Sequence, residues 1–258
     1  MPPLFAASDM HGHRSEFRDA LHDAGLIDTA GDWCGADARL WLLGDYFDRG
    51  PDGLGVVDDI RRWSTQAAYA GGDVQALLGN HEVFLMAAHR FGTDPVPGWP
   101  PEEGGYYGVW RLYGGRERDL RRLTPDHLAW LSSRPTLALA DDHLLAHCDS
   151  TGYLEFGASR NAVNDHVNAA LASSDPYIWL HLWSRFCGRG DLVSPAAVDK
   201  LLSIYGGSTI VHGHSTLLSH FGLTPAEAVT AHRYTGGRVL AIDGGVFEGG
   251  RILVTRLT

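Results

Sequence analysis

Short apolar runs alternate with amphipathic segments along the first third of the chain. Residues 4–8, 38–44 and 74–79 are mainly apolar runs, which predict buried strands. Each run is followed by a polar loop and then by apolar residues at helical spacing, over residues 14–25, 54–70 and 83–91. Strand–loop–helix units repeated in this way favour parallel strands in an α/β arrangement. Ligands of such sheets gather at the loops beyond the carboxyl ends of the strands.

The pattern becomes less regular after residue 91. A stretch dense in proline and glycine begins at Gly92 and predicts a Pro/Gly-rich loop over about residues 92–118. Residues 150–190 have a mixed pattern and predict a partly helical insertion. Because no convincing linker interrupts the chain, we expect one domain over residues 1–258. The remaining predicted elements are a helix from Thr124, a hairpin at 136–147, a helix at 194–204, a strand end at 208–215, and two strands at 238–245 and 251–257 that pair with each other.

Composition narrows the function classes. Hydrophobic residues make up 44% of the chain and charged residues 20%, which is ordinary for a globular protein. The net charge of -10 argues against a protein that binds nucleic acid non-specifically, since such proteins need a basic face. The 3 cysteines form no CxxC pair, so we expect neither a thiolate zinc site nor a disulfide framework. With no membrane span and no leader in the sequence, we expect a cytoplasmic protein that contacts neither membrane nor nucleic acid.

The residues that follow the predicted strands share one kind of chemistry. They are Asp9, His11, Asp45, Asp48, Asn80, His81, His147, His212 and His214. Carboxylate, imidazole and amide oxygen groups are ligands of a divalent metal of borderline hardness. This set exceeds what one ion can use, and it suits two adjacent ions that share a carboxylate and clamp a phosphoryl group. The strand ends therefore predict a two-metal site at one edge of the sheet.

Five motifs in this order resemble a known family. SDMHG, GDYFDRG, GNHE, LLAH and VHGH together resemble the calcineurin-like metallophosphoesterases. The DRG ending and the GNHE block are most similar to the branch that contains protein serine/threonine phosphatases and symmetrical diadenosine-tetraphosphate hydrolases. The resemblance implies two mixed β-sheets packed as a sandwich and flanked by helices, with a binuclear metal centre at the sandwich edge.

The resemblance also implies roles for individual residues. A metal-bridging water or hydroxide would be the nucleophile. His81 would protonate the leaving oxygen, and Asp48 would orient the His81 ring. Arg49 would grip the phosphate through its planar guanidinium, and Arg185 would be a second phosphate ligand with Arg189 as the competing choice. The implied metal ligands are Asp9, His11 and His214 for one ion, Asn80, His147 and His212 for the other, and Asp45 as the bridge.

Several questions stay open at the level of sequence. The ligand set accepts manganese, iron or zinc, of which we expect manganese. The motifs recognise a phosphoryl group, so the substrate is a phosphoprotein, a small phosphomonoester or a dinucleoside polyphosphate. A catalytically inactive scaffold and a nuclease are the less favoured alternatives, and the oligomeric state is undetermined. Asp149 is expected to cap a turn, although it could also contact a ligand histidine or the substrate. Trp99 and Trp110 are the tryptophans most expected to face substrate.

Overall fold

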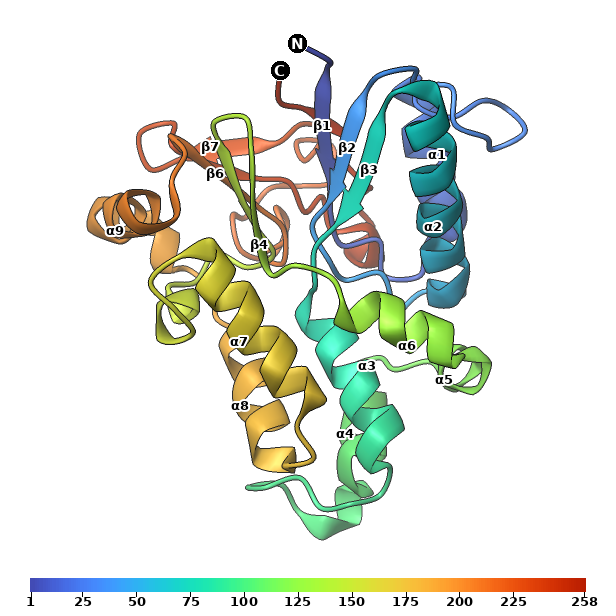
Figure 1. The fold of residues 1–258 in the computed structure, drawn as a ribbon, viewed down its shortest axis with the longest axis vertical. Helices are drawn as coiled ribbons and strands as arrows, with labels where there is room; N and C mark the ends of the chain where they lie inside the picture. Colours follow the sequence, from blue (N-terminus) through green and yellow to red (C-terminus); the bar gives the residue numbers. More distant parts are fainter.

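The chain folds into two β-sheets with helices beside and below them (Figure 1). The computed structural model describes residues 1–258. The strands are β1 (Leu4–Ala7), β2 (Arg39–Leu42), β3 (Asp73–Ala76), β4 (Leu137–Ala140), β5 (His143–Ala146), β6 (Thr209–His212), β7 (His232–Tyr234), β8 (Val239–Ala241) and β9 (Thr255–Arg256). The helices are α1 (Arg14–Asp23), α2 (Gly53–Ala70), α3 (Asn80–Phe91), α4 (Gly105–Leu112), α5 (Glu117–Arg122), α6 (Pro125–Ser132), α7 (Arg160–Ala172), α8 (Pro176–Phe186) and α9 (Pro195–Tyr205).

Both sheets are mixed. The first has the order β3-β2-β1-β9, with β1, β2 and β3 parallel and β9 antiparallel to β1. Ala7 pairs with Leu42 and Leu42 with Ala76, so these three strands end at one level and the loops that follow them begin side by side. The second sheet has the order β4-β5-β6-β8-β7, in which β5, β6 and β8 are parallel. The expected pairing of 238–245 with 251–257 is wrong, because β8 and β9 belong to different sheets.

The two sheets pack face to face. Leu4 of β1, Leu145 of β5, Val211 of β6 and Leu240 of β8 lie in one apolar cluster that contains residues of both sheets. A larger cluster of 53 buried residues joins the other faces of the strands to the helices. Side chains alternate along a strand, so one face of each sheet contributes to each cluster. The predicted α/β sandwich of two mixed sheets is confirmed.

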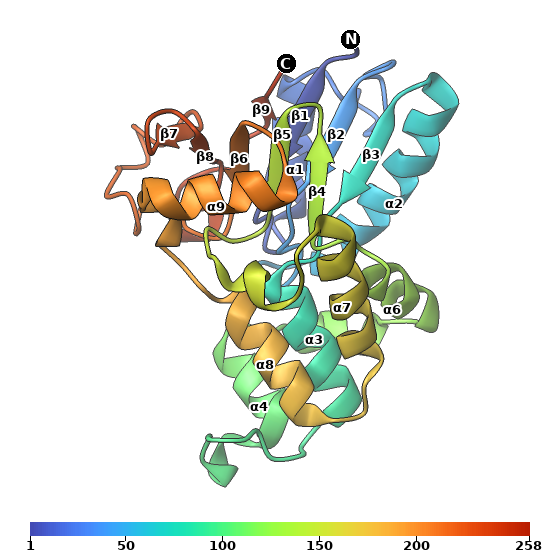
Figure 2. The ribbon, with the colours of Figure 1, turned by 60° about the vertical axis from the view of Figure 1, so that its left-hand side comes forward.

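The helices form layers around this sandwich. In Figure 1, α1 and α2 lie beside the first sheet, and α3, α4, α7 and α8 form a helical layer beyond the strand ends. Helix α3 packs against α4 and α8. Figure 2 shows α9 crossing the outer side of the second sheet. The arrowheads of β1, β2 and β3 point toward the start of α3, so their loops lie between the sandwich and the helical layer (Figure 1).

The predicted Pro/Gly-rich loop at 92–118 is only partly correct. Its first part is irregular, apart from one 3-10 turn at Pro101–Glu103, but residues 105–112 form α4. The α4 residues Tyr106, Val109 and Trp110 are buried at helical spacing. Gly105 and Gly108 interrupt this helix and obscured that spacing in the sequence. Strand β7 was also not expected. No helix combines the length and the hydrophobicity that a membrane span requires.

Candidate metal centre

The predicted site residues follow strands of both sheets, and all nine are buried. Because neighbouring parallel strands end at the same level, their loops converge at one edge of the sandwich. Asp9 and His11 follow β1, Asp45 and Asp48 follow β2, Asn80 and His81 open α3 just after β3, His147 follows β5, His212 ends β6, and His214 lies two residues beyond it.

The backbone of these loops is strained. Among non-glycine residues, nine have positive φ, and six of them are predicted site residues: Asp9, His11, Asp45, Asp48, Arg49 and His214. Positive φ is costly for residues with a Cβ, and such strain tends to collect at functional sites. Gly44 also has φ +105, and a Cβ there would lie 2.8 Å from the His147 ring. The loops thus direct polar side chains inward, and their backbone adopts unfavourable conformations to do so.

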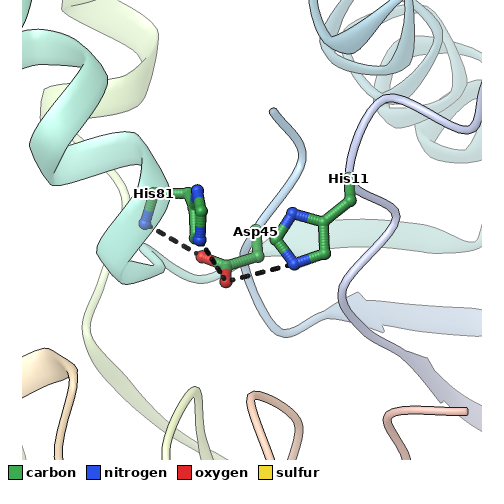
Figure 3. A group of neighbouring side chains, drawn as sticks. All are labelled: His11, Asp45 and His81. Atoms are coloured by element: carbon green, nitrogen blue, oxygen red, sulfur yellow. Dashed lines mark hydrogen bonds and ion pairs between the residues drawn. The ribbon is translucent and has the colours of Figure 1, made fainter. Parts of the chain in front are cut away.

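The Asp45 carboxylate lies at the middle of the cluster. Its Oδ2 is 3.7 Å from His11 Nε2 and 3.9 Å from His81 Nε2, and Figure 3 shows the carboxylate between these two rings. Its Oδ1 accepts the backbone N–H of His81 at 3.0 Å and lies 3.4 Å from His147 Nε2. Asp9 Oδ1 is 3.9 Å from His11 Nε2 on the same side. Each oxygen of Asp45 therefore faces a different group of potential ligands.

The second group contains His147, Asn80 and His214. His147 Nε2 lies 2.9 Å from Asn80 Oδ1, and the His147 and His214 rings are 4.9 Å apart. Ligand atoms of Asp45, His147 and His214 lie within 4.8 Å of one another, as do those of His11, Asp45 and His81. Asp45 belongs to both groups, as a bridging carboxylate would.

The chemistry of these groups fits metal ions. Asp9 Oδ1 and both ring nitrogens of His214 are buried without any hydrogen-bond partner, which is costly for polar atoms. His11 and His147 each donate Nδ1–H to a backbone carbonyl, of Phe47 at 2.9 Å and of Leu43 at 2.8 Å. Because Nδ1 carries the proton, Nε2 of each ring is an unprotonated acceptor that lies near Asp45, as in metal-binding histidines. Burial raises the pKa of Asp45, and repulsion from Asp9 adds to this, so a cation beside Asp45 would favour its charged form.

The structure does not bring His212 into the cluster, and its expected ligand role stays a prediction. Its Nε2 lies 2.8 Å from the Tyr234 hydroxyl and its Nδ1 lies 2.8 Å from Gly213 O, so both nitrogens have partners outside the cluster. His214 also groups with Asp45 and His147, whereas the sequence had suggested the Asp9 and His11 side. The VHGH motif offers two histidines, and regular strand alternation would place both on one face. Strand β6 ends at His212 and His214 has φ +65, so the backbone turns between them, which spacing alone did not reveal.

His81 and Asp48 form a close pair beside the centre. His81 Nδ1 lies 2.7 Å from Asp48 Oδ2, and the other carboxylate oxygen accepts Trp110 Nε1–H at 2.9 Å. Burial raises the pKa of Asp48 to about 8 and lowers the pKa of His81 to about 4, since both groups are removed from water. Trp110 is fully buried, so it fixes Asp48 and does not face substrate as the sequence suggested.

Arg49 lies over an aromatic ring at the edge of the centre. Its guanidinium carbon is 3.7 Å from the Phe247 ring centroid, and its NH2 is 3.3 Å from His81 Nε2. Phe247 also makes an edge contact with His11, at 5.0 Å between ring centroids. Sequence reasoning missed Phe247, because it lies after β8 in a segment that carried no recognised motif.

The structure separates the two arginines proposed as the second phosphate ligand. Arg185 Nε pairs with Glu155 Oε2 at 2.9 Å, and the Arg185 side chain is 44% exposed. Arg189 instead reaches the loop after β6, where it donates to the backbone carbonyl of His214 and, at 3.4 Å, to the Ser215 hydroxyl. The structure therefore brings Arg189 to the ligand loops and does not bring Arg185 there.

Asp149 does not cap a local turn as expected. Its Oδ2 accepts the backbone N–H of Gly190 at 2.8 Å, and its Oδ1 accepts the Ser215 hydroxyl at 2.6 Å. It is buried and has no hydrogen bond to a ligand histidine. Asp149 thus ties the end of the 150–190 segment to the loop that carries His214.

Two further buried carboxylates were missed. Glu82 accepts backbone N–H groups from Asp45 and Tyr46 at 2.8 Å each and from Gly79 at 2.9 Å, so it binds the β2 loop to the start of α3. Asp243 follows β8, and its Oδ2 is buried without a partner while Oδ1 accepts Gly245 N–H at 2.9 Å. Burial raises the pKa of Asp243, with repulsion from Asp9 adding to it. The other acidic site residues were predicted because each follows an apolar strand directly. Asp243 meets the same criterion.

Comparison with known sequences gives one family match and several partial relatives. The Metallophos family, described as calcineurin-like phosphoesterase, matches residues 2–216. The chain is 35% identical over 80 residues to Shewanella-like protein phosphatase 2 of Arabidopsis thaliana, which covers 31% of this chain and 20% of that protein. It is 37% identical over 82 residues to a symmetrical bis(5'-nucleosyl)-tetraphosphatase of Buchnera aphidicola, covering 32% and 25%. These matches span a quarter or less of the length of the relatives.

Comparison with solved structures supports the same fold. A cold-active protein-tyrosine phosphatase of a psychrophilic Shewanella species superimposes with a TM-score of 0.72. The superposition covers 98% of this chain and 75% of the other, at 21% sequence identity. At that identity the likeness concerns the fold alone, and it extends across the helical layer as well as the sandwich.

Proposed function

The chain belongs to the calcineurin-like phosphoesterases, a family of metal-dependent hydrolases, and we propose that it hydrolyses phosphomonoesters at a binuclear metal centre. The observation that carries this proposal is the set of unpartnered ligand atoms around Asp45, with the His81–Asp48 pair directly beside them. A scaffold without catalytic function would have no use for buried polar atoms that lack partners.

The proposed ligands divide between two ions. Asp9, His11 and Asp45 would hold the first ion, and Asp45, Asn80, His147 and His214 would hold the second. The distances of Asp45 to His11 and His147 support its place in both sets. His212 is left out of the ligand set, because both of its ring nitrogens are engaged elsewhere. We propose manganese for both positions, with iron or zinc as alternatives, since carboxylate, amide and imidazole ligands accept all three.

When bound, the two ions supply Lewis-acid polarisation of the phosphoryl group and lower the pKa of water. The side chains around them do the remaining work. His81 lies beside Asp45 and is oriented through Nδ1 by Asp48, so its Nε2 is placed to give a proton to the leaving oxygen. Trp110 holds Asp48 from behind. Arg49 binds the phosphoryl oxygens through charge-assisted hydrogen bonds.

The proposed substrate is a phosphorylated protein or a small phosphorylated metabolite in the cytoplasm. The match to a protein phosphatase over 80 residues supports this choice. Hydrolysis of a dinucleoside polyphosphate is the second candidate, and the match to a symmetrical bis(5'-nucleosyl)-tetraphosphatase favours it. The net charge of -10 argues against nucleic acid as the substrate.

The proposal is tested by metal removal. Chelation should abolish hydrolysis of an artificial aryl phosphate, and added manganese should restore it. A panel of phosphorylated compounds, assayed with manganese, would then separate the candidate substrates. Hydrolysis of the aryl phosphate that continues at full rate after complete chelation would contradict the binuclear mechanism.

A further inference from the structure

Beside the metal centre lies a cavity with an unusual concentration of positive charge. It has a volume of about 540 Å³, and we call it the arginine pocket. Five arginines line it: Arg49, Arg111, Arg116, Arg118 and Arg121. The chain has only 21 lysines and arginines against 31 acids, so an acidic protein places nearly a quarter of its basic side chains around one cavity. A larger cavity of about 620 Å³, between α1 and residues 250–256, has mixed charge.

Most of this charge is not neutralised by the protein. Glu117 is the one acid in the lining, and it pairs with Arg121 at 3.0 Å. Arg111, Arg116 and Arg118 are exposed and make no ion pair with a carboxylate. Like charges held together without partners repel one another, so an anion in the pocket would relieve that repulsion.

The pocket is built on a fixed segment. The loop between α4 and α5 docks on the loop that carries Arg49: Arg49 N–H donates to Gly114 O at 2.8 Å, and Arg116 Nε–H donates to Arg49 O at 2.9 Å. Arg111 donates to Gly115 O at 2.6 Å within the same loop. Arg49 also lies 3.3 Å from His81, so one residue belongs to both the pocket and the metal centre.

We propose that the arginine pocket binds additional phosphate groups of the substrate, next to the phosphate that is cleaved; this inference rests on the proposed function. Five of the nine lining residues are arginines, and Pro51 is the one apolar side chain, so charge dominates what the pocket can recognise. Guanidinium groups match phosphate oxygens in a planar, two-pronged geometry. A concave cavity of this size suits a short phosphate chain or a second phosphate on a small molecule. The substrate class is therefore a small compound with two or more phosphates.

The test compares inorganic phosphate with inorganic tripolyphosphate by calorimetric titration of the metal-loaded protein. Wild-type protein should bind tripolyphosphate at least about tenfold more tightly than phosphate. The double variant Arg111→Gln/Arg118→Gln should lose about tenfold of this preference, and the preference should weaken with salt. Arg90→Gln is the matched control: Arg90 is also an exposed arginine, ten residues along α3 from Asn80 and so roughly 15 Å away. Tripolyphosphate also chelates metal ions, but this effect is the same for every protein compared and so does not alter the differences between them.

The outcomes separate this inference from the proposed function. An unchanged preference in the double variant, while aryl phosphate is still hydrolysed, overturns the arginine pocket and leaves the phosphatase standing. An arginine-dependent preference in a protein that hydrolyses nothing supports the pocket and counts against the enzyme. If an acidic phosphopeptide gains from the arginines and tripolyphosphate does not, the small-molecule assignment is wrong. Equal thermal unfolding midpoints of the three proteins exclude a folding defect.

Discussion

Two regions of the molecule meet at Arg49 but are built differently. The metal-ligand loops follow β1, β2, β3, β5 and β6, and the arginine segment consists of residues 111–121. Ligand residues such as Asp9 and Asp45 are 1% exposed, and many have strained backbone. The arginine segment is mostly exposed and is held to the Arg49 loop by backbone-directed hydrogen bonds. Buried ligands are costly to arrange and tolerate little change, whereas exposed arginines can vary without disturbing the core. The difference suggests that the loops perform the chemistry and the segment selects the substrate.

The strongest challenge to the ligand loops is Asp45→Asn. Because both groups of ligands share this carboxylate, the variant should lose metal from both positions and at least ~10³-fold in turnover. Metal analysis of the purified protein and a turnover assay with aryl phosphate measure the two effects. Asp142→Asn, an exposed acid in the β4–β5 turn, is the control and should keep both. Two ions per chain in Asp45→Asn would refute the bridging assignment.

The variant His81→Ala tests whether the metal-ligand loops contain a proton donor in addition to metal ligands. The variant should keep its metal but lose roughly 10²–10⁴-fold in kcat, since the leaving oxygen loses its acid. The loss should shrink for aryl phosphates whose leaving group needs no proton. His89→Ala, an exposed histidine of α3, should behave as wild type. A loss that is uniform across good and poor leaving groups would argue against the acid role.

Arg49→Ala removes the residue that the two regions share. Loss of a charge-assisted hydrogen bond costs about 1.5–3 kcal/mol, or roughly ten- to hundredfold in kcat/KM. We expect that reduction on every substrate, with weaker inhibition by inorganic phosphate, and Arg61→Ala in α2 serves as the control. Progress-curve kinetics with inorganic phosphate as inhibitor measure both effects. Undiminished phosphate inhibition in Arg49→Ala would mean that this arginine does not touch the phosphoryl group.

Trp110→Phe tests how far positioning matters inside the ligand loops. Trp110 touches Asp48 and not the centre, so its loss should lower kcat by about fivefold, equivalent to ~1 kcal/mol for one hydrogen bond, with KM little changed. The matched control is Trp179→Phe, which also loses one indole hydrogen bond, to Ser173 O. If both variants change kcat equally, the effect of Trp110 is general destabilisation and the positioning role is lost.

The smallest effect is expected for Arg185→Ala. An exposed ion pair such as Arg185–Glu155 contributes about 0–1 kcal/mol to stability, and neither residue is among the groups of potential metal ligands. Steady-state kinetics should therefore change by less than about twofold, whereas Arg189→Ala should be impaired because Arg189 supports the His214 loop. A severe kinetic defect in Arg185→Ala, with Arg189→Ala silent, would restore the arginine first chosen from the sequence.

The first part of the fold was predictable because its signals are local. Apolar runs with polar ends located β1, β2 and β3, and the same rule found the residues that now surround Asp45. The strands that β8 and β9 pair with could not be predicted, since neither strand's sequence specifies which of the two sheets it joins. Helix α4 was not predicted, because glycines interrupt its apolar face.

The remaining errors in the site concern side-chain direction. His212 and His214 are two residues apart, and only the packing of Tyr234 against His212 reveals which of them faces the centre. Phe247 and Trp110 act through contacts with residues distant in the sequence, so no spacing rule could identify them. The arginine pocket shows the same limit, because nothing in the sequence pattern assigned a role to four of its arginines.

The central claim is that two metal ions lie on either side of Asp45. Crystals of the manganese-loaded protein, measured at the manganese absorption edge, test it directly. The account predicts two anomalous peaks, one next to Asp9 and His11 and one next to His147 and His214, both within coordination distance of Asp45 and neither at His212. A single peak, or a peak coordinated by His212, would contradict it.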